Sequence, residues 1–345
     1  MAHQEPDRAT WEALYAAAAR FFALKPWRWM LDSDVFGVKN PANGEIGWCC
    51  IMGAAEEHYA LAVYLGTEGL EVLKQIGLRE VPTDPFSVLM MQKCLMASFE
   101  DRELMEAPDL ETIRVLGLNF RARNTWPQFR SYLPGYAPWT LTQDEALFLT
   151  LALDQACEVS QQYRARPEEL GTQNALNNYE TFLVRVPVSA AEHLEWKDAT
   201  ESPPPFEAPL ILPSPADVKR AQKLAAKTKR ARSVVDMDYF SLPSAIMGEG
   251  DERPWYPQVV LCVDDESGMV LHFDMLNRGE LGKAFGEAFI ELVTRMKQVP
   301  GTVQVRTEQA LILLEPIAAL LDVELKLTDS LPAITEAQQG LLSSL

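Results

Sequence analysis

Residues 34–66 read "DVFGVKNPANGEIGWCCIMGAAEEHYALAVYLG" and contain three apolar runs separated by short breaks. Apolar runs of this length between turn-forming residues are typical of strands. The pattern predicts three antiparallel strands in a meander, over 35–38, 46–52 and 59–65. Asn43 and Gly44 lie between the first two runs, and Asn-Gly favours a tight hairpin turn because it accepts positive φ at low cost. We therefore expect an N-terminal α+β domain, an antiparallel meander with helices.

Aromatic residues lie just before the meander, in "KPWRWM" at 25–30. Together with a tryptophan of the second predicted strand, they would offer aromatic faces and a guanidinium to an anionic or peptide ligand. These candidate ligand-binding residues are Trp27, Arg28, Trp29 and Trp48. In the alternative interpretation they are core residues, since a helix predicted over 8–24 ends at Pro26 and must be sealed against the sheet. Trp27 and Trp29 would then close one edge of the sheet.

A proline-rich stretch divides the chain. The segment "KDATESPPPFEAPLILPSPADV" at 197–218 has no helical period and is the best candidate for a linker. We therefore predict an N-terminal domain over 1–196 and a C-terminal domain over 219–345. Within the N-terminal domain, the apolar run at 87–99 predicts a further strand.

The C-terminal segment alternates between apolar patterns typical of strands and apolar patterns typical of helices. After residue 233 the patterns predict strands and helices in the order β-β-β-α-β-α-β-α. Over about residues 233–328, this order resembles the ribonuclease H-like fold of integrases and transposases, which implies an α/β domain. Active members of that fold place acidic residues on the first strand, just after the fourth strand and on a helix. Together these residues hold two divalent ions for phosphodiester chemistry.

Only the first of these acidic positions is matched clearly. Asp236 and Asp238 lie on the same face of the first predicted strand. Arg306 and Thr307 follow the fourth strand, where the resemblance requires a carboxylate, and a positive charge there opposes cation binding. We therefore expect no cofactor, no catalytic residue and no metal ligand. The alternative is a Mg²⁺ or Mn²⁺ site in which Asp236 and Asp238 are both catalytic residues and metal ligands.

Basic residues are concentrated in "ADVKRAQKLAAKTKRARS" at 216–233. Five of them are candidates for contact with a nucleic-acid backbone: Lys219, Arg220, Lys223, Lys227 and Arg230. No aromatic residue lies among them, so base stacking is not supported. The chain has 31 Lys and Arg against 49 Asp and Glu, a formal net charge of −18. This charge repels phosphate backbones, so a nucleic-acid partner is not expected and the segment would instead offset an acidic protein surface.

Composition also indicates the compartment. The five cysteines are an odd number without a CxxC pair, as is typical of reduced thiols in a cytoplasmic protein. No apolar run reaches the length of a membrane span, and the N-terminus lacks a secretory signal pattern. The four histidines show no zinc-binding spacing, and no P-loop or GxSxG motif occurs. We expect a cytoplasmic protein without a membrane partner.

A second resemblance covers most of the chain. The pattern "PWRWMLDSDVFGVKNPANGEIGWCCIMGAAEEHYALAVYLGTEGL" at 26–70 is similar to the N-terminal domain of a bacterial family of two-domain proteins. In that family the domain is joined to one much like residues 233–340 here. The resemblance implies a bacterial cytoplasmic origin and brings no activity. We predict a non-enzymatic binding or regulatory protein that engages a protein or a small molecule. The alternative is a divalent-metal-dependent nuclease or phosphodiesterase with a ribonuclease H-like site.

Overall fold

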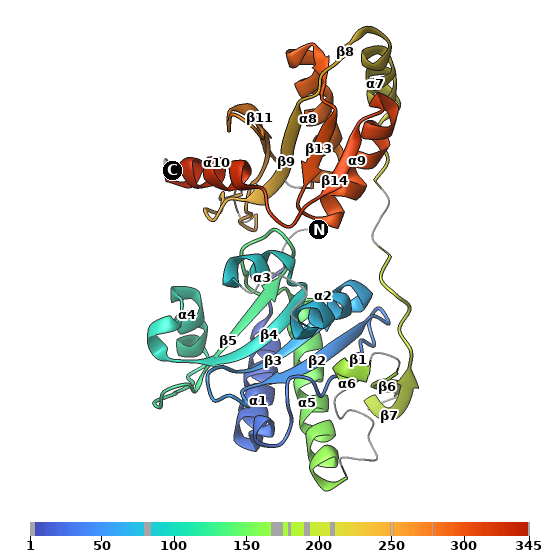
Figure 1. Cartoon of the computed structure of the whole chain (residues 1–345). Helices are drawn as coiled ribbons and strands as arrows, with labels where there is room; N and C mark the ends of the chain where they lie inside the picture. Colours follow the sequence, from blue (N-terminus) through green and yellow to red (C-terminus); the bar gives the residue numbers. More distant parts are fainter. Residues whose placement is uncertain are drawn as a thin grey trace. The chain divides into compact units, whose positions relative to one another are not determined.

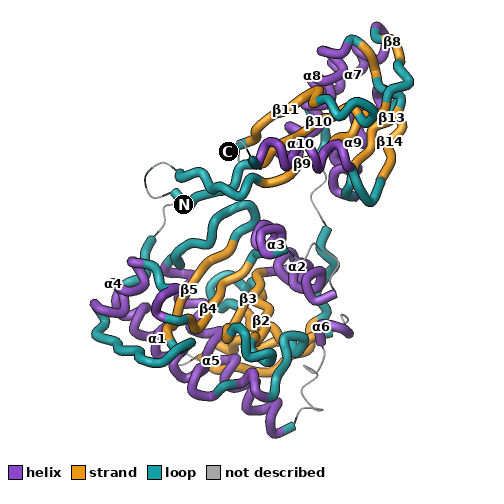
Figure 2. The backbone as a smooth tube through the Cα atoms, turned by 60° about the vertical axis from the view of Figure 1, so that its left-hand side comes forward, coloured by secondary structure: helices purple, strands orange, loops and turns teal. Residues whose placement is uncertain are grey.

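The computed structural model describes residues 4–78, 84–166, 175–178, 181–189, 194–207, 211–248, 250, 252–277 and 279–343. The chain divides into two compact units, whose elements are shown in Figures 1 and 2. The first unit comprises Met1–Glu207 and Glu249–Arg253, and the second comprises Ala208–Gly248 and Pro254–Leu345. Each unit is mixed α/β and has its own sheet. In the part of the chain described, no helix is long and apolar enough to cross a membrane.

The first unit is built on a seven-stranded sheet in the order β5-β4-β3-β2-β1-β6-β7. The predicted meander is confirmed, because β1, β2 and β3 are antiparallel neighbours, and it continues through β4 into β5. The sheet is mixed because β6 pairs parallel to β1 before β7 turns back along it. The strands are β1 (Phe36–Lys39), β2 (Ile46–Met52), β3 (Tyr59–Leu65), β4 (Cys94–Glu100), β5 (Trp126–Tyr132), β6 (Phe182–Ser189) and β7 (Leu194–Glu201).

Helices cover both faces of this sheet, as Figure 1 shows. On one face α1 (Arg8–Leu24) and α5 (Gln143–Ala165) pack against each other and against the strands. On the other face the core is completed by α2 (Gly66–Leu78) and α6 (Ala175–Asn178). The two faces separate because side chains of a strand alternate between them. Along β2, Cys49 and Ile51 therefore join the first core, whereas Trp48 and Cys50 join the second.

Two short helical segments lie beside β4 and β5. The 3-10 helix η2 (Arg102–Leu104) follows β4 directly, and α4 (Ala107–Val115) comes next. Asp109 of α4 forms a two-pronged ion pair with the buried Arg130 of β5, at 2.8 and 2.6 Å. This pair attaches α4 to the strand, and the residues after α4 return to begin β5.

The predicted strand over 87–99 is wrong in its first half. Residues Pro85–Met91 form helix α3, and the strand β4 begins only at Cys94. The Asp84 side chain accepts a hydrogen bond from the Ser87 backbone N–H at 2.9 Å, and proline occupies the first turn. Both features favour a helix start. The apolar run that follows fits either a helix or a strand, so the start signal decides.

The chain between the two predicted domains also differs from the expectation. Strand β7 runs to Glu201, so its last five residues, 197–201, belong to a hairpin with β6 rather than to a linker. The strand lies at the edge of the sheet and most of its side chains are exposed. It therefore lacks the apolar alternation that identifies a half-buried strand. The described residues 202–207 and 211–214 lie outside helices and strands, and Ser214 then caps α7 (Pro215–Lys227).

The second unit has a five-stranded sheet in the order β11-β10-β9-β13-β14. The first three strands in the sequence are antiparallel neighbours, whereas β13 is parallel to β9 and β14 is parallel to β13. The predicted order of elements is confirmed: β9 (Val234–Ser241), β10 (Gln258–Asp264), β11 (Val270–Leu276), α8 (Leu281–Met296), β13 (Thr302–Val305), α9 (Glu308–Leu321), β14 (Glu324–Leu327) and α10 (Pro332–Leu342).

This sheet is also covered on both faces. Helices α7, α8 and α9 pack on one face, and α10 packs on the other against β9 and β10. Two short strands, β8 (Lys229–Arg230) and β12 (Gln298–Val299), pair in parallel outside the main sheet. The regular apolar stripe of α8 accounts for its position, since Phe285, Phe289 and Val293 are all fully buried.

Candidate functional site

The alternation along β9 separates its acidic residues from its apolar ones. Val235 and Met237 lie in the core beneath α8 and α9, so Asp236 and Asp238 lie on the opposite face. In the antiparallel register Asp236 is opposite Val263 and Asp238 is opposite Leu261. Both carboxylates are buried, with relative exposures of 0% and 1%. A buried carboxylate needs compensation, because removing a charge from water costs free energy.

Arg306 provides that compensation for Asp238. The arginine directly follows β13, which pairs parallel to β9. Its Nη2 lies 2.7 Å from Oδ2 of Asp238. In addition to this ion pair, the backbone N–H of Tyr239 donates a hydrogen bond to Oδ1, at 2.9 Å. Burial raises the pKa of Asp238, and the guanidinium and this N–H oppose that rise.

Asp236 has no such compensation. Neither carboxylate oxygen has a hydrogen-bond partner among the described residues. Burial, followed by the negative charges of Asp265 and Asp264, raises the pKa of Asp236 to about 6. The side chain is therefore half-protonated near pH 6 and mostly ionised at neutral pH.

The described residues do not fit a divalent metal site. None of their His, Cys, Asp and Glu side chains form a group of three or more that could hold a metal ion. The position after β13 carries the guanidinium of Arg306, which already pairs with one of the two candidate ligands. A cation beside Asp238 would therefore meet a positive charge as well as a negative one.

The structure does not bring the four candidate ligand-binding residues Trp27, Arg28, Trp29 and Trp48 together in one site. Trp27 is buried between α1 and the sheet, with ring centroids 4.8 Å from Tyr59 and 5.8 Å from Phe21. Trp48 lies in the core on the other face, 5.0 Å from the ring of Phe182, and its Nε1 donates to the carbonyl of Gly66 at 3.0 Å. The two rings thus serve separate cores.

The other two members of the predicted set point to other surroundings. Trp29 donates through Nε1 to the carbonyl of Ser160 at 2.9 Å, and the guanidinium of Arg164 lies 4.8 Å from its ring centroid. Arg28 is exposed beside Trp27 at a shallow hollow of about 450 Å³. The packing interpretation fits Trp27, Trp29 and Trp48, and only Arg28 lies open to solvent.

The basic residues near the start of the second unit fall into two groups. Four are exposed on α7: Lys219, Arg220, Lys223 and Lys227. Arg230 instead sits in β8 and binds the end of α9, donating to the carbonyls of Leu321 at 3.1 Å and Asp322 at 2.5 Å. A guanidinium at a helix C-terminus satisfies free carbonyls and suits the helix dipole. Arg230 thus has a structural partner, and the structure does not join it to the other four.

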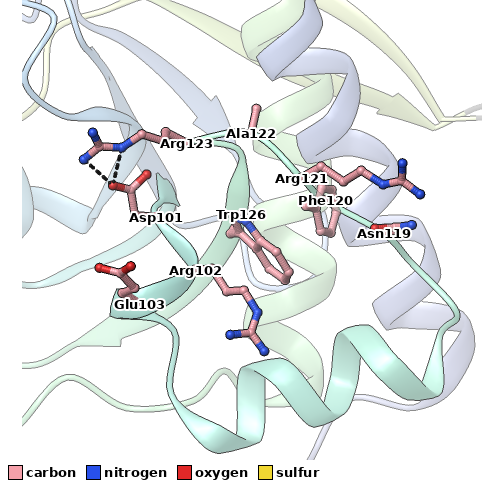
Figure 3. A pocket seen from close by; sticks show the side chains of 9 residues that line it. All are labelled: Asp101, Arg102, Glu103, Asn119, Phe120, Arg121, Ala122, Arg123 and Trp126. Atoms are coloured by element: carbon pink, nitrogen blue, oxygen red, sulfur yellow. Dashed lines mark hydrogen bonds and ion pairs between the residues drawn. The ribbon is translucent and has the colours of Figure 1, made fainter.

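One hollow of the first unit was not identified from the sequence. Figure 3 shows it between η2 and the residues that lead into β5, with a volume of about 790 Å³. Arg123 donates to Oδ2 of Asp101 through Nε and Nη2, at 3.1 and 2.9 Å, and the Asn124 N–H donates to Oδ1 at 2.8 Å. These bonds connect the end of β4 to the start of β5, and Arg123 lowers the pKa of Asp101.

Aromatic and basic side chains line the rest of this hollow. The ring centroids of Phe120 and Trp126 are 5.7 Å apart, and Phe120 also stacks on Tyr15 of α1 at 6.4 Å. The guanidinium carbon of Arg102 lies 5.8 Å from the centroid of the Trp126 ring. Arg121 is exposed at the same hollow. The sequence signal for this hollow is the occurrence of two arginines between two aromatic residues in "NFRARNTW" at 119–126.

Comparison with protein families gives two matches and no activity. Residues 11–185 match the family model "Domain of unknown function (DUF7309)", and residues 220–342 match "Domain of unknown function (DUF6930)". No curated protein matches the chain. The pair of matches agrees with the two-domain resemblance seen in the sequence. Because the first match spans more than half of the 345 residues, the chain belongs to the DUF7309 family.

Proposed function

We propose that this protein is a non-enzymatic binding or regulatory protein of the bacterial cytoplasm. The ion pair between Arg306 and Asp238, with 2.7 Å between Nη2 and Oδ2, carries the proposal. A guanidinium fixed at this position offsets a buried carboxylate that would otherwise attract a metal ion. The partner would be a protein or a small molecule, because the net charge of −18 disfavours a nucleic acid.

The proposal includes a ribonuclease H-like identity for the C-terminal domain. Three antiparallel strands followed by two parallel ones, in the order β11-β10-β9-β13-β14, support it. In the active members of that fold, acidic residues on the first strand and after the fourth hold the metal ions. Here the first strand carries Asp236 and Asp238, and the fourth is followed by Arg306. The domain would then keep the fold and present it as a binding scaffold.

Two further parts of the proposal rest on other observations. We place the domain boundary in the predicted linker, 197–218, beyond the end of β7; the interval between the two family matches supports this. All five cysteines are free thiols, and four of them are buried: Cys49, Cys50, Cys94 and Cys262. Free thiols are typical of a reducing compartment, which supports a cytoplasmic location. The resemblance to a bacterial two-domain family supports the origin.

One observation favours the alternative, a divalent-metal-dependent nuclease or phosphodiesterase. Both oxygens of Asp236 are buried without a hydrogen-bond partner among the described residues. Buried carboxylates are normally paired or bound to a metal. Such an enzyme would require Mg²⁺ or Mn²⁺ as a cofactor, and Arg306 is the residue that opposes it.

Calorimetric titration with Mn²⁺ separates the two functions. The full-length protein is compared with the Asp236→Asn, Asp238→Asn double variant and with Glu336→Gln, which removes an exposed carboxylate of α10 as a matched control. We expect no saturable binding to any of the three proteins. Saturable binding to the wild type and to Glu336→Gln that is lost in the double variant would overturn the proposal. Cleavage of a labelled oligonucleotide with Mn²⁺, dependent on the same two aspartates, would overturn it directly.

A further inference from the structure

We infer that the hollow between η2 and the start of β5 binds a small planar anion, a heterocyclic ring joined to a phosphate group. The ring would stack on Trp126, and Arg102 would hold the phosphate, with Arg121 of the same hollow as a further positive charge. This inference goes beyond the proposed function, because it stands whether or not the C-terminal domain is catalytic.

The charges around the hollow favour an anion. Of its three arginines, Arg123 is paired with Asp101. Arg102 and Arg121 are exposed and have no ion pair within the described residues. Figure 3 shows Arg102 beside the Trp126 indole and Arg121 beyond Phe120, with its guanidinium turned away from the indole; Glu103 also points away from the indole. Each of these two guanidinium groups can hold a phosphate through two parallel hydrogen bonds.

The aromatic floor favours a planar ring. Trp126 is half-buried at the first residue of β5, where it pairs with Glu100 of β4. Phe120 supports its ring from one side and is itself stacked on Tyr15, so the indole is positioned by the core of the domain. A positioned ring loses little side-chain entropy when a ligand stacks on it. The cation–π contact keeps the Arg102 guanidinium within 5.8 Å of the same ring centroid, close to where an anionic substituent would lie.

The size of the hollow favours a small molecule over a polymer as the ligand. Its volume of about 790 Å³ lies in the range of small-molecule sites, roughly 300–1,000 Å³. The bonds from Arg123 and Asn124 to Asp101 fix the two walls to each other, so the site is preformed on the backbone. A single-stranded nucleic acid would need a basic groove several nucleotides long. The exposed basic residues here are confined to one hollow, so we favour a mononucleotide-sized ligand.

The test is calorimetry on the full-length protein with the four ribonucleoside monophosphates, each titrated separately, and with a nucleoside and inorganic phosphate as partial ligands. We expect saturable binding of at least one monophosphate, and weaker binding of its nucleoside and of phosphate by about tenfold or more. The Arg102→Gln, Arg121→Gln double variant should bind about tenfold or more weakly. Arg114→Gln is the matched control, since it removes an exposed arginine of α4 that does not line the hollow.

Three results would overturn the inference. The first is the absence of binding by all four monophosphates at about 1 mM. The second is binding that the double arginine variant leaves unchanged. The third is a short oligonucleotide that binds far more tightly than any monophosphate, since the surface would then be a nucleic-acid site. Trp126→Phe keeps a stacking face if Trp126→Ala fails to fold, and it should retain part of the affinity. These outcomes are independent of the Mn²⁺ titration.

Discussion

Arg306 and Asp238 meet at 2.7 Å because β13 pairs in parallel with β9 and the arginine directly follows the strand. The two partners differ in exposure: the carboxylate side chain is 1% exposed and the guanidinium side chain 36%. Losing the arginine leaves a buried negative charge, whereas losing the carboxylate leaves a cation that can turn toward water. Removing Arg306 should therefore cost more free energy of folding than removing the Asp238 carboxylate.

Removing the arginine should destabilise the protein more than removing the acid. We expect Arg306→Met to lower the free energy of unfolding by about 2 kcal/mol at neutral pH, because Asp238 then stays buried and unpaired. Asp238→Asn should change it by less than about 1 kcal/mol. Urea unfolding followed by circular dichroism measures both. The Asp238→Asn, Arg306→Met double variant should recover most of the loss. Equal effects of the two single substitutions would contradict the asymmetry.

The pKa of Asp236 predicts an unusual pH dependence. Because this pKa is raised from 3.8 to about 6 in the folded protein, the folded state binds the proton more tightly than the unfolded state. The ionised side chain therefore destabilises the fold fully above about pH 6, and this loss diminishes as the pH falls toward 4. Asp236→Asn should raise the free energy of unfolding by about 2–3 kcal/mol at pH near 7.5. At pH near 4 it should change little. A variant that is less stable than the wild type at neutral pH would show that the carboxylate has a favourable partner.

The Arg130–Asp109 pair should be important for the first unit. Arg130 is buried in β5 and donates two hydrogen bonds to Asp109, which lies in the first turn of α4. Arg130→Met should lower the free energy of unfolding by about 3 kcal/mol, since it leaves a largely buried carboxylate unpaired. Arg114→Met is the control, because its pair with Glu111 is exposed on both sides. That change should cost clearly less than the loss of Arg130. Similar costs in urea unfolding would refute the structural role of Arg130.

The basic residues of the second unit should differ in how much they contribute to stability. Arg230→Gln should lower the free energy of unfolding by about 1 kcal/mol, because the end of α9 loses a guanidinium that binds its carbonyls. Simultaneous substitution of the four exposed basic residues of α7 by glutamine should change it by less than about 0.5 kcal/mol. Thermal melts of the two variants provide the comparison. If the α7 variant is strongly destabilised, these side chains contribute more to the fold than the ion pair between Arg220 and Asp217.

Much of the strand pattern could be predicted from the sequence where strands are half-buried or fully buried. The apolar runs of β2 and β3, and the order of elements from β9 to α10, follow directly from local pattern. Exposed strand β7 escaped prediction, because an edge strand needs no apolar face. Helix α3 was misassigned because "SVLMM" suits a buried strand as well as a helix, and only Asp84 and Pro85 distinguish them.

For the candidate sites, the sequence predicts the element on which a residue lies but not the residue it contacts. Asp238 and Arg306 could both be located on their elements from the sequence, but their contact depends on a parallel pairing that no local pattern encodes. The hollow at Arg102 and Trp126 was missed because its walls come from separate segments that meet through the β4–β5 pairing. The predicted ligand site at Trp27 and Trp48 does not form for the opposite reason. The two residues are near in sequence, but they lie on opposite faces of one sheet.

Arg306 has a consequence for how the second unit depends on its surroundings. A metal ion can be chelated, diluted or replaced by a different ion. A buried carboxylate that depends on a bound metal ion then loses its compensating charge. A guanidinium is part of the polypeptide: it is present in every molecule at a ratio of one to one and keeps its charge across the physiological pH range. The buried Asp238 of this chain is therefore neutralised from the moment of folding, whatever the supply of ions in the cell.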